Sequence, residues 1–81
     1  MSKEVAEFMI FVVEQVANRF FAGDQSAAYL AMKKSGLWAF FSDTYETSHT
    51  LGVAYLMEDA ENWFAKSGIS YAAVESYEVV Q

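Results

Sequence analysis

The stretch SKEVAEFMIFVVEQVANRFFA, residues 2–22, decides the fold, because its apolar side chains recur at the spacing of an α-helix. Successive residues of a helix are rotated by about 100°, so residues three and four apart share one face. The main apolar stripe consists of Val5, Phe8, Met9, Val12, Val16 and Phe20. A second set widens it: Ala6, Ile10, Val13, Ala17 and Phe21. The stretch therefore predicts a helix that is apolar over more than half of its circumference.

The opposite side of this helix is expected to face solvent. Glu7, Glu14 and Asn18 mark that side, and Phe11 lies among them without a second apolar neighbour. Apolar surface that a protein's own core does not cover usually marks a contact with another protein. We therefore expect Phe11, with Glu7 and Glu14 beside it, to form an interaction surface for a second copy of the chain or for another protein. The alternative is that the C-terminal tail folds back over this helix.

A second helix is expected to begin at Asp24 and to end before Gly36. The carboxylate of Asp24 is a good N-cap, because it can accept hydrogen bonds from the free backbone N–H groups of the first turn. Lys33 and Lys34 lie in the last turn, where positive charge suits the helix dipole. Gly36 fits a left-handed stop, since glycine adopts that backbone conformation without steric cost.

A last helix is expected over residues 51–67 and ends at Gly68, in a second Lys-Ser-Gly sequence that repeats the same stop. Its apolar stripe consists of Val53, Leu56, Met57, Ala60, Trp63 and Phe64. Between the helices, residues 37–45 predict a short apolar turn or helix, and residues 42–50 predict a polar connector. The possible N-caps of the last helix are Thr47, Ser48 and Thr50.

These patterns predict an all-α fold, a small bundle of three to four helices built as a single domain from residues 1–69. Residues 70–81 form a C-terminal extension, for which the pattern allows a short helix or an edge strand. A domain of 81 residues needs large side chains inside, because much of its surface stays in water. The aromatic residues expected in the core are Trp38, Phe40, Phe41, Trp63 and Phe64.

The charge of the chain argues against a nucleic-acid partner. Its 11 acidic and 5 basic residues give a formal net charge of -6, and only Lys33 and Lys34 are adjacent bases. Nucleic-acid binding depends on Lys and Arg contacts with phosphate. A DNA-binding regulator, in which the second and third elements would form a helix-turn-helix, is therefore the least favoured function.

Other features of the composition indicate the cellular setting. The longest uninterrupted apolar run covers residues 8–13, far short of the roughly 18 residues that a membrane span needs. The start of the chain does not resemble a signal peptide. The absence of cysteine excludes disulfides and thiolate metal sites, which fits a reducing compartment. We expect a cytoplasmic protein that does not contact the membrane.

The residues with catalytic potential are few. His49 is the only histidine, and a general base needs a partner group within hydrogen-bond reach. With Tyr45, Thr50 and Asp59 it defines a candidate polar site, which would make the protein a small ligand-binding domain or enzyme. No phosphate-binding loop, nucleophile elbow or zinc-ligand spacing accompanies these residues. We therefore expect no enzyme activity, no metal and no cofactor.

Several short motifs follow one another in a family-like order. Lys33-Lys34-x-Gly36 ends the second helix, Tyr45-x-x-x-His49-Thr50 precedes the last one, and Glu58-Asp59 lies inside it. Over residues 7–67 this order resembles the bacterial family numbered 3791 among the domains of unknown function, whose members are small helical domains. Two positions depart from the family pattern: Ser48 replaces an apolar residue and Ala27 replaces a carboxylate.

The resemblance implies a role but no activity. Members of this family occur beside ADP-ribosyltransferase-like proteins, which implies an antitoxin-like or regulatory partner of such a protein. It leaves the role of the matching positions His49 and Thr50 open, and we expect a structural role, in which Thr50 caps the last helix and His49 ties the connector to the core. Because no catalytic constellation is present and apolar surface is in excess, we interpret the chain as a protein-interaction module.

Overall fold

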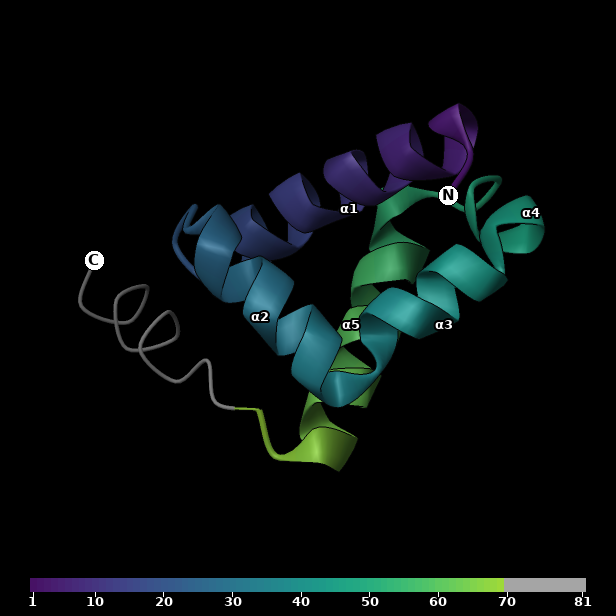
Figure 1. Cartoon of the computed structure of the whole chain (residues 1–81). Helices are drawn as coiled ribbons and strands as arrows, with labels where there is room; N and C mark the ends of the chain where they lie inside the picture. Colours follow the sequence, from purple (N-terminus) through teal and green to yellow (C-terminus); the bar gives the residue numbers. More distant parts are fainter. Residues whose placement is uncertain (70–81) are drawn as a thin grey trace.

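The structure is a computed structural model that describes residues 1–69, and it is built entirely from helices and their connections in that range (Figure 1). Along the chain the helices are α1 (Lys3–Phe20), α2 (Gln25–Ser35), α3 (Leu37–Asp43), α4 (Tyr45–Ser48) and α5 (Val53–Ser67). The predicted all-α class is confirmed. The described residues hold five helices rather than three to four, because the predicted polar connector contains the short helix α4.

The longest helix, α1, lies across the top of the view in Figure 1. Below it α2 and α3 meet at a corner, and α5 passes behind them. All three of these helices contact α1, and α2 and α3 also contact α5. The apolar stripe of α1 therefore covers one side of a core to which four helices contribute.

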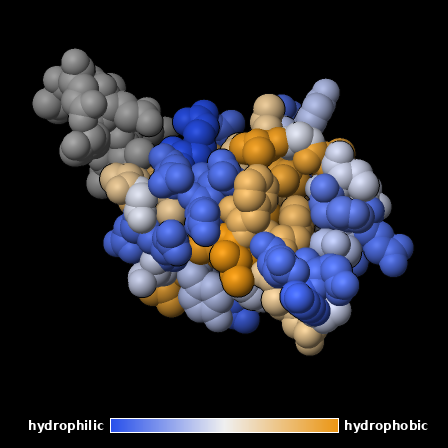
Figure 2. Space-filling model, turned by 90° about the horizontal axis from the view of Figure 1, so that it is seen from above, coloured by the Kyte–Doolittle hydropathy of each residue, from blue (hydrophilic) through white to orange (hydrophobic). Residues whose placement is uncertain are grey.

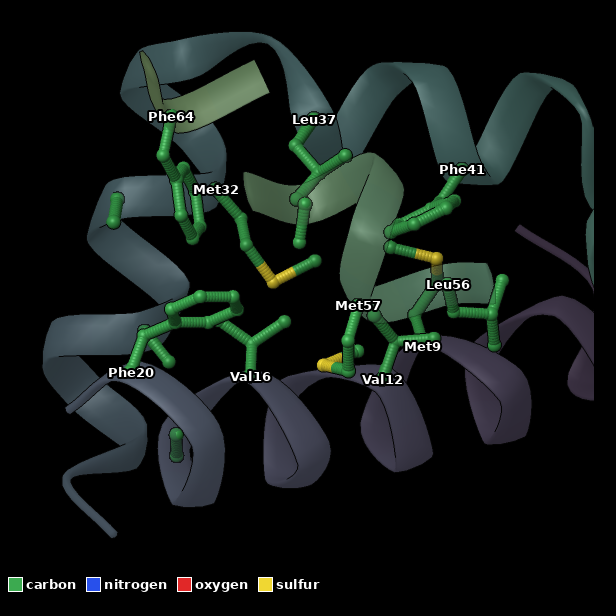
Figure 3. Close-up of a cluster of buried hydrophobic side chains, with 14 residues drawn as sticks. Met9, Val12, Val16, Phe20, Met32, Leu37, Phe41, Leu56, Met57 and Phe64 are labelled. Atoms are coloured by element: carbon green, nitrogen blue, oxygen red, sulfur yellow. The ribbon is translucent and has the colours of Figure 1, made fainter. Parts of the chain in front are cut away.

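The core is a single cluster of buried apolar side chains (Figure 3). From α1, side chains of the predicted main stripe point toward side chains of α2, α3 and α5. The cluster consists of Met9, Val12, Val16, Ala17, Phe20, Ala28, Ala31, Met32, Leu37, Phe41, Leu56, Met57, Ala60 and Phe64. Burial of this apolar surface is the main force that holds the helices together.

The aromatic residues predicted for the core divide into two groups. Phe41 and Phe64 are fully buried. Trp38, Phe40 and Trp63 are half-buried and pack against the cluster from outside. Large aromatic rings thus form both the centre and the edge of this small core, as the sequence predicted.

Both ends of α1 differ slightly from the predicted range of residues 2–22. Ser2 is the N-cap, and its hydroxyl accepts a hydrogen bond from the backbone N–H of Val5 at 3.3 Å. The helix ends at Phe20 because the chain then turns into the left-handed region, with φ of 53° at Ala22 and 87° at Gly23. This left-handed turn ends the helix two residues before the predicted position and leads directly into α2.

The predicted N-cap of α2 is confirmed. Asp24 has an extended backbone, and its carboxylate oxygen Oδ1 accepts a hydrogen bond from the backbone N–H of Ala27 at 3.0 Å. This bond satisfies one of the backbone N–H groups that have no partner inside the helix. The start of α2 was thus predictable from local chemistry.

We expect Asp24→Ala to lower the free energy of unfolding by about 1 kcal/mol, the usual effect of losing an N-cap side chain. Urea denaturation followed by circular dichroism would measure the change. Asp24→Asn is the matched control, because an asparagine side chain keeps an oxygen acceptor at the same place. Equal losses for both variants would show that the side-chain oxygen does not act as a cap.

The two Lys-Ser-Gly stops form as predicted, with φ of 88° at Gly36 and 68° at Gly68. After α5, the N–H of Ile69 donates to the carbonyl oxygen of Phe64 at 3.0 Å, which is the hydrogen bond of a Schellman stop. The prediction that both helices end in the same left-handed backbone conformation is therefore confirmed. The hydrogen bonds at the two stops nevertheless differ.

At the end of α2 a serine hydroxyl takes the place of the direct backbone bond. Ser35 Oγ donates to the carbonyl oxygen of Met32 at 3.2 Å and accepts from the N–H of Leu37 at 3.3 Å. The hydroxyl of Ser67 then donates to the carbonyl oxygen of Ser35 at 3.2 Å. The last residues of α2 and α5 are thus joined directly, although 32 positions separate them.

The prediction that residues 42–50 form a polar connector without helical structure is wrong. Helix α3 continues to Asp43 and α4 follows after a single residue, Thr44. The hydroxyl of Thr44 donates to the carbonyl oxygen of Phe40 and lies 2.7 Å from the hydroxyl of Ser48, which is buried. Hydroxyl side chains therefore bond back to the local backbone, which lets a polar sequence fold as a helical turn.

The predicted start of α5 is also wrong. The helix begins at Val53 rather than Leu51, its N-cap is Gly52, and no side chain caps it. The candidate caps Thr47, Ser48 and Thr50 therefore do not act there. The reason is that α4 and the turn after it occupy these residues, and the hydroxyls of Ser48 and Thr50 bond to Thr44 and to the backbone of Thr47.

Two further predictions concern the C-terminal extension and the absence of a membrane span. The C-terminal extension, residues 70–81, lies outside the described residues, and so does the alternative in which it folds back over the first helix. In the part of the chain that the structure describes, none of the helices combines the length and apolarity needed to cross a membrane.

Candidate functional site

The candidate interaction surface lies on the solvent-facing side of α1, where Glu7, Phe11 and Glu14 are all exposed as expected. Phe11 keeps 40% of its surface accessible. The structure adds Ile10, which is 61% accessible in the middle of the same helix. Two large apolar side chains, consecutive in the sequence, are therefore exposed on the outside of α1.

The geometry of the helix explains this arrangement. Met9, Val12 and Val16 are at most 1% accessible and fix which side of α1 faces the core. At about 100° per residue, Ile10 and Phe11 then fall on the two edges of the opposite face. We call this face the α1 outer face; its exposed residues are Lys3, Glu7, Ile10, Phe11, Glu14 and Asn18.

Along the helix axis, the charges of this face lie on either side of Ile10 and Phe11, the pair that we call the apolar centre. Glu7 lies about one turn before Ile10 and Phe11, and Glu14 lies about one turn after them. Among the described residues, neither glutamate takes part in an ion pair. The α1 outer face therefore presents an apolar patch with a free carboxylate at each end.

Figure 2, which views the molecule from the side on which α1 lies, shows hydrophobic residues gathered in a band across the middle of this face. Hydrophilic residues border the band on both sides. Large apolar side chains of other helices and connections are also exposed: Tyr29, Leu30, Leu51, Val53 and Tyr55. Apolar surface that gathers in one place, rather than scattering singly, is the usual mark of a binding surface.

A shallow groove lies between α1 and α2. It is lined by Val13 of α1 and by Gln25, Ser26, Tyr29 and Leu30 of α2. The ring of Tyr29 makes an edge-to-face contact with the ring of Trp38, and the two ring centres lie 5.1 Å apart. One aromatic side chain that lines the groove is therefore packed against α3.

Sequence reasoning missed Ile10. The sequence placed it in the widened stripe with Ala6, Val13, Ala17 and Phe21 and did not single it out as exposed; in the structure only Ala17 of this set is buried. Ile10 lies at the far edge of that stripe, where the neighbouring helices no longer reach. The signal was the width of the stripe itself, because a helix apolar around more than half its circumference cannot be covered by one small core.

The predicted polar site is only partly assembled. Tyr45 and His49 stack face to face with ring centres 4.3 Å apart and planes 10° from parallel. His49 Nδ1 donates a hydrogen bond to the carbonyl oxygen of Tyr45 at 2.7 Å. Tyr45 is the first residue of α4 and His49 directly follows its last residue, so the two rings stack across one helical turn. The role expected for His49, tying the connector to the core, is wrong because its side chain is exposed.

The other two members of the predicted polar site do not join this pair. The hydroxyl of Thr50 donates to the carbonyl oxygen of Thr47 at 2.7 Å, so its expected role as helix cap is wrong. Asp59 is half-buried on α5, and within residues 1–69 no hydrogen bond or ion pair connects it to Tyr45, His49 or Thr50. No acid–base pair is therefore formed by these four residues.

Tyr45 also lines an open groove between the start of α1 and the segment of α3 and α4. The groove carries three carboxylates, Glu4, Asp43 and Glu46, and several hydroxyl groups. No group of three or more His, Cys, Asp or Glu side chains in the described part of the chain is arranged to hold a metal ion. The groove is therefore an open surface of acidic character.

The chain is similar to one known protein family. A family model described as "Protein of unknown function (DUF3791)" matches residues 7–66, from the first half of α1 almost to the end of α5. The resemblance inferred from the sequence motifs is thereby confirmed. No curated protein matches the chain, and no solved structure matches it either.

Proposed function

The chain belongs to the DUF3791 family, whose description assigns no activity, and we propose from the structure that it is a protein-interaction module that binds another protein through the α1 outer face. One observation carries the proposal. Ile10 and Phe11 are 61% and 40% accessible in the middle of a helix whose opposite face buries Met9, Val12 and Val16. Burying the part of each side chain that is still accessible would contribute a fraction of the roughly 1.5–3 kcal/mol that full burial of such a side chain is worth.

The composition of the face supports the same function. Interfaces combine an apolar, aromatic-rich centre with a polar rim. On α1 the centre is formed by Ile10 and Phe11, and the rim by Glu7, Glu14 and Asn18. The role that the family resemblance implied, an antitoxin-like or regulatory partner of an ADP-ribosyltransferase-like protein, belongs to this class of function.

The alternative functions have less support. A ligand-binding domain or enzyme around Tyr45, His49 and Asp59 would need these groups to converge in a pocket. Instead His49 is exposed and bonded to its own turn, and Asp59 is not joined to it among the described residues. A DNA-binding regulator would need a basic surface, which a chain of net charge -6 does not offer.

The proposal predicts that a partner is lost when the α1 outer face is made polar. The tagged protein and its Ile10→Ser/Phe11→Ser variant would each be used for affinity capture from the source cells. We expect a stoichiometric protein on the wild type and at least a tenfold loss on the variant, because few buried apolar residues carry most of the affinity of an interface.

Tyr55→Ser is the matched control for this capture, since Tyr55 is 66% accessible but lies on α5. It should retain the same protein as the wild type. Circular dichroism would verify that all three chains are folded. A partner retained equally by the α1 variant would contradict the proposed use of this face.

A further inference from the structure

The charges of the α1 outer face restrict the kind of partner that it fits. Glu7 and Glu14 lie at equal distances on either side of the point midway between Ile10 and Phe11, about 5 Å away along the helix axis. Both are exposed and, within residues 1–69, free of ion pairs. A helix that covers the apolar centre must therefore place its own side chains opposite both carboxylates.

A second copy of the chain is poorly suited to that position. If two α1 helices pack antiparallel with their apolar centres together, Glu7 of each copy faces Glu14 of the other. If they pack parallel, each glutamate faces its own equivalent. Both arrangements bring like charges together, which opposes association.

The only cation of the face does not relieve this repulsion. In the antiparallel pair, Lys3 faces Asn18 rather than a glutamate. Moving Lys3 opposite Glu14 requires a shift of four residues, which places Ile10 opposite Glu7 and separates the apolar centres. The other basic residue of α1, Arg19, lies off this face with its guanidinium 5.4 Å from the ring centre of Phe20.

We infer that the partner of the α1 outer face is not the same face of a second copy but a different protein that presents an amphipathic helix with Lys or Arg on both sides of an apolar centre. This inference rests on the proposed function and specifies its partner. Such a helix would bury Ile10 and Phe11 while its two cations pair with Glu7 and Glu14. The complex should weaken as salt increases, because part of its affinity comes from exposed charges.

The chain itself can supply a probe with this chemistry. The variant Glu7→Lys/Glu14→Lys keeps Ile10 and Phe11 but carries a cation on each side of them. Mixed with the wild type, it should form a one-to-one heterodimer in sedimentation velocity, while each chain alone stays monomeric. Between about 0.05 M and 0.5 M salt, we expect the Kd of the heterodimer to rise roughly three- to tenfold.

Two controls separate this effect from others. Glu58→Lys/Glu61→Lys changes the net charge equally on exposed positions of α5, and it should not bind the wild type. Phe11→Ser in the wild-type chain should abolish the heterodimer, because the apolar centre is lost. A further variant, Glu7→Gln/Glu14→Gln, removes the repulsion without adding charge and should self-associate more strongly than the wild type.

Each contrary result has a distinct meaning. If the wild type alone dimerises through Phe11 as tightly as the mixture, the partner is a second copy; the inference fails and the proposed function stands. If the mixture associates no better than the wild type alone, or the α5 variant binds equally well, basic flanks do not define the partner and the inference also fails. Failure of the proposed function would be seen in the capture experiment, if the Ile10→Ser/Phe11→Ser variant retained as much of the partner as the wild type.

Discussion

Phe41→Ala should lower the free energy of unfolding by about 3–5 kcal/mol, the usual effect of removing a buried phenylalanine ring. Phe41 is 0% accessible and points from α3 into the core cluster (Figure 3). Its ring meets that of Phe8 edge to face, with ring centres 6.2 Å apart, and this contact joins α3 to α1. Removal of the ring therefore leaves a cavity and also loses a contact between two helices.

The size of this loss is large for so small a protein. A chain of 81 residues has a total stability of about 4–12 kcal/mol. Urea denaturation followed by circular dichroism would measure the change. Phe11→Ala is the matched control, because it removes the same atoms from an exposed position and should cost less than about 1 kcal/mol. Similar losses for both variants would show that Phe41 is not part of the core.

Gly36→Ala should lower the free energy of unfolding by about 2 kcal/mol. Part of the loss comes from the backbone, because φ at Gly36 is 88° and an L-residue in the left-handed region costs about 1–2 kcal/mol. The rest is steric, since the added Cβ would lie 3.1 Å from an atom of the Trp63 ring. The glycine thus allows the end of α2 to approach α5 closely.

Gly68→Ala separates the two contributions. Its φ of 68° is also left-handed, but an added Cβ would meet no atom of residues 1–69 within 4 Å. This variant should lose only the backbone contribution, about 1 kcal/mol. Thermal unfolding of both variants would compare them directly. A loss at Gly68 equal to that at Gly36 would mean that the Trp63 ring moves aside without cost.

Local signals predicted much of the fold correctly. The apolar repeat of α1, the carboxylate of Asp24 and the left-handed stops at Gly36 and Gly68 all act within a few residues of chain. The short helix α4 and the uncapped start of α5 at Gly52 were not predicted. Their polar residues can bond to the backbone in several local conformations, and neighbouring helices select among them.

The candidate site was predicted less completely than the fold. Exposure of Phe11 follows from its position opposite the stripe, and the structure places it there. Exposure of Ile10 does not follow, because the sequence shows how wide the stripe is but not which edge the other helices cover. The separation of Asp59 from His49 is likewise a matter of how α5 packs.

The sequence by itself determined that this protein is helical, where α2 begins and where α2 and α5 stop, because helix periodicity and capping depend on nearby residues. Only the tertiary structure decided that the serines of the two stops join α2 to α5, and that Ile10 stays outside beside Phe11. These features depend on the packing of helices distant in the chain, since each helix can cover only part of the apolar circumference of α1.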